Sequence, residues 1–107
     1  MKKVLLIGSN GLLGSSLVKV LQPLFKLITV TRTSQNSDYN LDMASKSKSS
    51  QLFSEVKPDL IINLAALTNV DTCEENIDLA YRVNSRIAEN IANNTSSFFI
   101  ISLYSAP

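Results

Sequence analysis

Apolar residues along the chain fall into two kinds of segment, short continuous runs and longer stretches with helical spacing. Apolar or β-branched runs at residues 3–7, 26–31, 59–64 and 97–102 predict strands, and the run at 59–64 is typical of a central parallel strand buried on both faces. Apolar residues three or four apart predict helices at residues 12–21, before Pro23, and 73–91. Strands that alternate with helices indicate an α/β fold with a parallel sheet.

The stretch at residues 33–54 is polar and serine-rich, and its pattern is the weakest in the chain. A linker is one interpretation. We favour a loop, a short strand at 39–41 and a helix at 45–56 that Lys57-Pro58 would close. The complete order of elements then predicts one domain over residues 1–107, a Rossmann-type doubly wound parallel sheet with strand order 3-2-1-4-5.

All three glycines of the chain lie in one window, Gly8-Ser9-Asn10-Gly11-Leu12-Leu13-Gly14, between the first strand and the first helix. Gly8 would let the chain turn off the strand, Gly11 would let a dinucleotide approach the backbone, and Gly14 would let the helix pack closely on the sheet. A hairpin at Asn10-Gly11 is the alternative. The helical spacing that follows favours a phosphate cradle, to which the helix N-terminus adds partial positive charge.

The end of the second strand bears on the choice of cofactor. NAD-binding domains carry an Asp or Glu there, about 20 residues past the glycines, for the ribose 2′-OH. This chain has Thr29-Val30-Thr31-Arg32-Thr33, with no acid. A guanidinium at Arg32 would pair with a 2′-phosphate, so we expect NADP rather than NAD, although NAD stays possible. The alternative is that Arg32 is a solvated loop cation.

The composition excludes several kinds of chemistry. The net charge is +1, which argues against a nucleic-acid or polybasic membrane surface. The absence of histidine removes Ser-His-Asp catalysis and His-ligated zinc, and Cys73 is the only cysteine, so we expect no metal site and no internal disulfide. A single cysteine fits a reducing, cytoplasmic setting. The apolar run after Lys3 is too short for a secretion signal, and no stretch of the sequence approaches the roughly twenty apolar residues of a membrane span.

Four parts of the chain together resemble the extended short-chain dehydrogenase/reductase superfamily, and within it the dTDP-4-dehydrorhamnose reductases and their sugar-nucleotide-binding relatives. These parts are the glycine window, Leu41-Asp42-Met43, residues 58–71, and the motifs Glu74-Glu75-Asn76, Ala80-Tyr81, Val83-Asn84 and Ala88-Glu89-Asn90. The resemblance extends to about residue 102, and its most specific part is residues 59–84.

The resemblance implies an NADP-dependent reductase of a nucleotide-linked keto-sugar and gives roles to particular residues. Asp42 would bond the adenine amino group and Met43 would pack beside the ring. The other implied cofactor contacts are Gly11, Leu12 and Leu13 along the pyrophosphate, Ala65, Ala66 and Leu67 along the adenosine and nicotinamide-ribose path, and Asn84 at the inner end of the site. The residues alone leave other interpretations open. Asp42 is equally a candidate for the N-cap of the helix after it, Ala65-Ala66 could serve close packing, and Asn84 could be a polar residue on the helix surface.

The sequence also departs from the family. The Tyr-x-x-x-Lys pair that reduces the sugar does not occur in these residues, because Met43 and Ser85 stand four positions after Tyr39 and Tyr81, and Tyr104 lies three residues before Pro107. The family's Ser/Thr-Thr-Asp reads Ser102-Leu103-Tyr104, which leaves Ser102 as a weak catalytic candidate.

We therefore expect a truncated domain that holds the adenosine half of the cofactor without turnover. Its apolar strand edge at residues 98–101 would invite self-association. The alternatives are a non-catalytic NAD(P)-binding regulatory module and a nucleotide-sugar epimerase or dehydratase.

Overall fold

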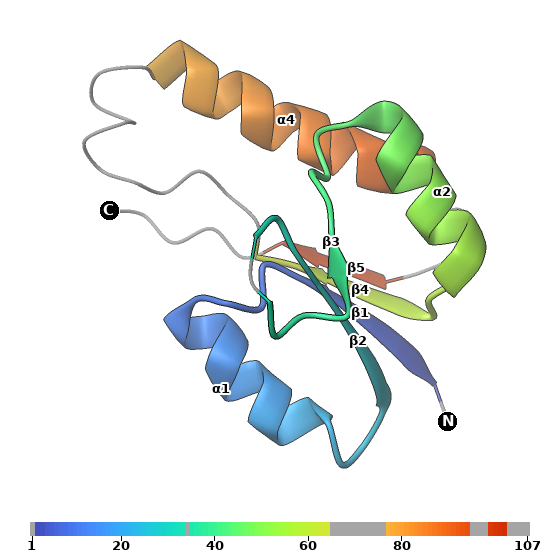
Figure 1. Ribbon diagram of the computed structural model, residues 1–107. Coiled ribbons are helices and arrows are strands. Elements are labelled where there is room, and N and C mark those ends of the chain that lie inside the picture. Colours follow the sequence, from blue (N-terminus) through green and yellow to red (C-terminus); the bar gives the residue numbers. More distant parts are fainter. Residues whose placement is uncertain (1, 34, 65–76, 95–98, 103–107) are drawn as a thin grey trace.

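The structure, a computed structural model, describes residues 2–33, 35–64, 77–94 and 99–102 (Figure 1). Its centre is a parallel sheet in the order β3-β2-β1-β4-β5, which confirms the predicted order and the Rossmann-type α/β class. The strands are β1 (Lys3–Ile7), β2 (Lys26–Thr31), β3 (Tyr39–Asn40), β4 (Leu60–Asn63) and β5 (Phe99–Ser102).

Helices cover both faces of the sheet (Figure 1). The helix α1 (Leu12–Leu21) lies on one face, and α2 (Lys46–Val56) and α4 (Ile77–Asn93) lie on the other. Successive strand side chains point to opposite faces. In β1, Val4 and Leu6 therefore pack on the α1 side, whereas Leu5 and Ile7 pack on the side of α2 and α4. Burial on both faces explains why β1 and β4 are apolar throughout.

The register brings the carboxyl ends of the strands to one edge of the sheet. Ile7 at the end of β1 lies beside Val30 of β2 and Asn63 of β4. The chain order reverses between β1 and β4, since β2 and β3 lie on one side and β4 and β5 on the other. Open α/β sheets bind ligands outside the strand ends at such a reversal point. The carboxyl edge of the sheet, where β1 and β4 end, is therefore the place where this fold would bind a ligand.

The helix α2 shows why the serine-rich stretch is a structured element and not a linker. The Ser45 side chain caps its start by accepting a hydrogen bond from the Lys48 amide. At its end, Lys57 adopts the left-handed conformation with φ 50°, and the Lys3 ammonium donates to the Val56 carbonyl at 3.1 Å. A cation near the last carbonyls stabilises the helix, because it interacts favourably with the negative end of the helix dipole.

The predicted and observed bounds agree closely. Those of β1, α1 and β2 are the same in both. The strand expected at 39–41 is one residue shorter, the helix at 45–56 begins one residue later, and β4 is one residue shorter at each end than the strand expected at 59–64. The strand expected at 97–102 agrees with β5 over residues 99–102. The residues before Ile77 in the helix expected at 73–91, and Phe98 in the expected edge, lie outside the described residues. None of the helices in the described part is long and apolar enough to cross a membrane.

Candidate functional site

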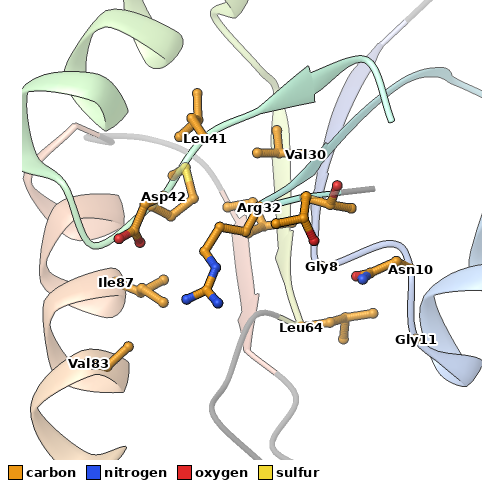
Figure 2. Close-up of a pocket in the computed structure, with 14 residues that line it drawn as sticks. Gly8, Asn10, Gly11, Val30, Arg32, Leu41, Asp42, Leu64, Val83 and Ile87 are labelled. Atoms are coloured by element: carbon orange, nitrogen blue, oxygen red, sulfur yellow. The ribbon is translucent and has the colours of Figure 1, made fainter. Parts of the chain in front are cut away.

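A cavity of about 380 Å³ opens at the carboxyl edge of the sheet, between the glycine turn, the end of β2 and α4 (Figure 2). Its lining residues are Ile7, Gly8, Asn10, Gly11, Val30, Thr31, Arg32, Thr33, Leu41, Asp42, Met43, Leu64, Val83 and Ile87. One end of the cavity is main chain, and another is apolar wall from the strand ends and α4. The described residues hold no cluster of three or more His, Cys, Asp or Glu that could bind a metal ion.

The glycine turn is held by main-chain geometry. Gly8 has φ 85°, a conformation that side chains disfavour, and its amide donates to the Val30 carbonyl at 2.8 Å. A Cβ on Gly14 would lie 2.7 Å from Ser9 Cα and 2.8 Å from the Gly8 carbonyl oxygen. Gly14 is therefore required for close packing, but against the turn that leaves β1. The atoms nearest to Gly14 lie directly after Ile7, where β1 ends.

Gly11 differs from the other two glycines. It is the N-cap of α1, with φ −83° and ψ 178°, which any residue can adopt. A Cβ there would meet nothing within 4 Å in the described part of the chain. Neither conformation nor packing within the chain calls for glycine, so the space in front of the backbone is free for a ligand. No side chain caps this helix end and no acid lies in its first turn, so its partial positive charge suits a phosphate.

Arg32 follows β2, and its side chain reaches into the cavity toward α4 (Figure 2). Within the described part of the chain, no hydrogen bond or ion pair holds its guanidinium. The loop after it is anchored. Thr31 Oγ1 lies 2.7 Å from Ser37 Oγ, and Asn40 Nδ2 donates to both hydroxyls. The anchored loop presents a free cation at the cavity, which fits an anionic ligand group.

The turn after β3 forms another wall. Asp42 Oδ1 accepts a hydrogen bond from the Ala44 amide at 2.9 Å, and the Asp42 side chain is exposed. Ser45 caps α2, so the interpretation of Asp42 as the helix N-cap was wrong. Met43 is 3% exposed and belongs to the core between the sheet and α4, while it also lines the cavity. This wall combines one carboxylate with apolar surface.

The structure brings together six of the predicted site residues at the cavity: Gly8, Asn10, Gly11, Arg32, Asp42 and Met43. It does not bring Leu12, Leu13, Gly14 or Asn84 into the lining. Leu12 is 93% exposed, and Asn84 lies on α4 one position after Val83. Ala65, Ala66 and Leu67 lie outside the described residues, and Ser102 is described only as the last residue of β5.

Eight lining residues were not predicted as site residues from the sequence: Ile7, Val30, Thr31, Thr33, Leu41, Leu64, Val83 and Ile87. Two signals could have found most of them. Ile7, Thr31 and Leu64 stand at or just past the ends of strands that meet at the reversal point. Val83 and Ile87 lie four apart on the helix that follows β4, so they share one face.

The sheet order and this site define an α/β protein of the Rossmann type, with the fold of short-chain dehydrogenases and reductases. Within that class, the chain belongs to the family described as RmlD substrate binding domain, which matches residues 1–104.

Relatives of known sequence or structure agree with this assignment. The dTDP-4-dehydrorhamnose reductase of Escherichia coli is 34% identical over 89 residues, covering 83% of this chain. The structure of a hypothetical dTDP-4-dehydrorhamnose reductase from Sulfolobus tokodaii matches 95% of the chain with a TM-score of 0.84 and 28% identity. The dTDP-4-dehydrorhamnose reductase of Bacillus anthracis, solved in complex with NADP, matches 88% with a TM-score of 0.74 and 34% identity.

This chain spans about a third of the length of these relatives. It covers 29% of the Escherichia coli protein, 38% of the Sulfolobus tokodaii chain and 32% of the Bacillus anthracis chain. The matched part corresponds to their N-terminal portion.

Proposed function

We propose that residues 1–107 form the cofactor-binding domain of an NAD(P)-dependent reductase of a nucleotide-linked keto-sugar, and that its cofactor is NADP. The observation that carries the proposal is the cavity, which is lined both by the bare backbone at Gly11 and by the Arg32 side chain, a cation without a partner among the described residues. Anion-binding groups at both ends of an apolar wall suit a phosphorylated dinucleotide.

Different parts of the site would bind different parts of the cofactor. The pyrophosphate would lie against the main chain from Gly8 to Gly11, near the start of α1, where helix amides are unpaired. Arg32 would donate two parallel hydrogen bonds to the 2′-phosphate. Asp42 would accept a hydrogen bond from the adenine amino group, and Met43 and Ile87 would contact the ring from the apolar wall.

When bound, the reduced cofactor supplies a hydride to the carbonyl carbon of the sugar. The residues of this site would bind and orient the cofactor, and they move no proton. Tyr-x-x-x-Lys does not occur within residues 1–107, so the proposal assigns the carbonyl chemistry to none of them. A cytoplasmic location and self-association through residues 98–101 also stay predictions.

Titration calorimetry with NADP and NAD tests the proposal. We expect the chain to bind NADP more tightly than NAD. The substitution Arg32→Ala should lower the affinity for NADP by about tenfold or more, because it removes hydrogen bonds to a charged group. The affinity for NAD should stay within about twofold. Arg86→Ala is the matched control, because Arg86 is an exposed arginine of α4 outside the cavity lining. Equal affinity for the two cofactors, or an equal loss in both variants, would contradict the role of Arg32.

A further inference from the structure

A buried hydrogen bond joins two elements that are far apart in the sequence. Asn90 of α4 is 7% exposed, and its Nδ2 donates to the Met43 carbonyl at 2.9 Å across 47 positions. The Asn90 carbonyl in turn accepts from Asn94 Nδ2 at 2.7 Å near the end of the helix. A buried amide that loses its partner carries a desolvation penalty, so this bond fixes the distance between α4 and the turn after β3.

That turn is the one that carries Asp42. On the side of β2, the turn is held by the Leu41 amide, which donates to the Thr31 carbonyl at 3.1 Å. On the side of α4, Asn90 donates its hydrogen bond to the residue directly after Asp42. The position of the Asp42 carboxylate relative to the wall of α4 therefore depends on this amide.

Asn90 also lies on the face of α4 that forms the cavity wall. Ile87 lines the cavity three positions before it, and Val83 lies four positions before Ile87. Residues three and four apart are neighbours on a helix surface. The same helix face therefore supplies both the apolar wall and the hydrogen bond that holds the opposite, polar wall.

We propose that Asn90 is a positioning residue for adenine recognition: it holds the Asp42 turn at the distance from α4 that one purine ring occupies. This inference rests on the proposed function, because it assigns the gap between Asp42 and Ile87 to adenine. Asn90 itself touches no part of the cofactor and acts through the Met43 carbonyl.

The test compares NADP with deamino-NADP, in which hypoxanthine replaces adenine. Hypoxanthine has a carbonyl oxygen where adenine has its amino group, so the Asp42 carboxylate should reject it. We expect the unaltered chain to prefer NADP by about tenfold or more, as a hydrogen bond to a charged group implies. Asn90→Leu should lower that preference by at least about threefold, because the turn is no longer hydrogen-bonded to α4.

The ratio of the two affinities separates positioning from loss of folding. If part of a variant is unfolded, both apparent affinities fall by the same factor and their ratio does not change. Asn93→Leu is the matched control on the exposed side of the same helix, and it should keep the full preference. Should Asn90→Leu fail to fold, Asn90→Ser, whose hydroxyl is too short to reach the Met43 carbonyl, gives the same readout.

The outcomes are distinct. A lower ratio in the Asn90 variants with an unchanged ratio in Asn93→Leu supports the inference. An unchanged ratio in the Asn90 variants overturns it and leaves NADP binding intact. Failure of the unaltered chain to bind NADP overturns the proposed function, and the inference with it.

Discussion

The two turns that border the cavity are built in different ways. The turn between Gly8 and Gly11 depends mainly on main-chain geometry, through the hydrogen bond from the Gly8 amide to β2 and the close approach of Gly14. The turn at 41–45 has main-chain hydrogen bonds too, and it is also tied by side chains, through Asp42 on Ala44 and Asn90 on Met43. The comparison teaches that the proposed phosphate end of the cavity can be specified by a few adjacent residues, whereas the proposed adenosine end depends on contacts between distant elements.

The largest effect should come from adding a methyl group at Gly14. In Gly14→Ala the new Cβ would lie 2.7 Å from Ser9 Cα and 2.8 Å from the Gly8 oxygen, and backbone cannot move aside easily. We expect a net loss of about 2 kcal/mol in the free energy of unfolding, since overpacking outweighs the roughly 1 kcal/mol that alanine gains in a helix. Urea unfolding followed by circular dichroism measures it. A stability equal to that of the unaltered chain would show that the turn is not built on this contact.

The same substitution at Gly11, three positions earlier, should weaken NADP binding and leave stability almost unchanged. In Gly11→Ala the added Cβ meets nothing in the described part of the chain, and φ −83° is unstrained. The free energy of unfolding should change by less than about 1 kcal/mol, because lower chain entropy offsets a poorer N-cap.

The affinity of Gly11→Ala for NADP should fall by about tenfold, because the methyl group occupies the path of the phosphates. Calorimetry beside urea unfolding separates the two quantities. Unchanged affinity would show that the free space at Gly11 is not the phosphate site.

A small effect is expected at the cap of α2. Ser45→Ala removes the oxygen that accepts from the Lys48 amide at 3.4 Å, a long hydrogen bond. The free energy of unfolding should fall by about 0.5–1 kcal/mol. NADP affinity should stay within about twofold, because Ser45 does not line the cavity. Thermal unfolding and calorimetry give the two values, and a large loss of affinity would mean that the cap also sets the Asp42 turn.

The proposed phosphate end of the cavity was predictable because its signals are local. Three glycines between an apolar run and a helical pattern were enough to predict β1, the turn and α1. The predicted bounds of β1 and α1 equal the observed ones. Arg32 was predictable for the same reason, because it directly follows a β-branched run. These features depend on neighbours in the sequence, which a pattern records.

The proposed adenosine end of the cavity could be predicted only in part. The resemblance indicated Asp42 and Met43, and the structure places both at the cavity. The bond from Asn90 joins positions 47 apart, and no local pattern records such a contact. Ile87 resembles any core residue of an amphipathic helix, because its place at a cavity follows from where α4 packs and not from its own spacing.

The most direct test of the central claim is an NMR titration of the isotope-labelled chain with NADP. The account predicts progressive shifts in the amide signals of Gly8, Gly11, Arg32 and Asp42, which border the cavity. It predicts no shift for Gln51 and Glu55, which are exposed on α2 and absent from the lining. Shifts confined to other elements, or no shift at NADP concentrations that saturate related reductases, would contradict the claim that this cavity is the dinucleotide site.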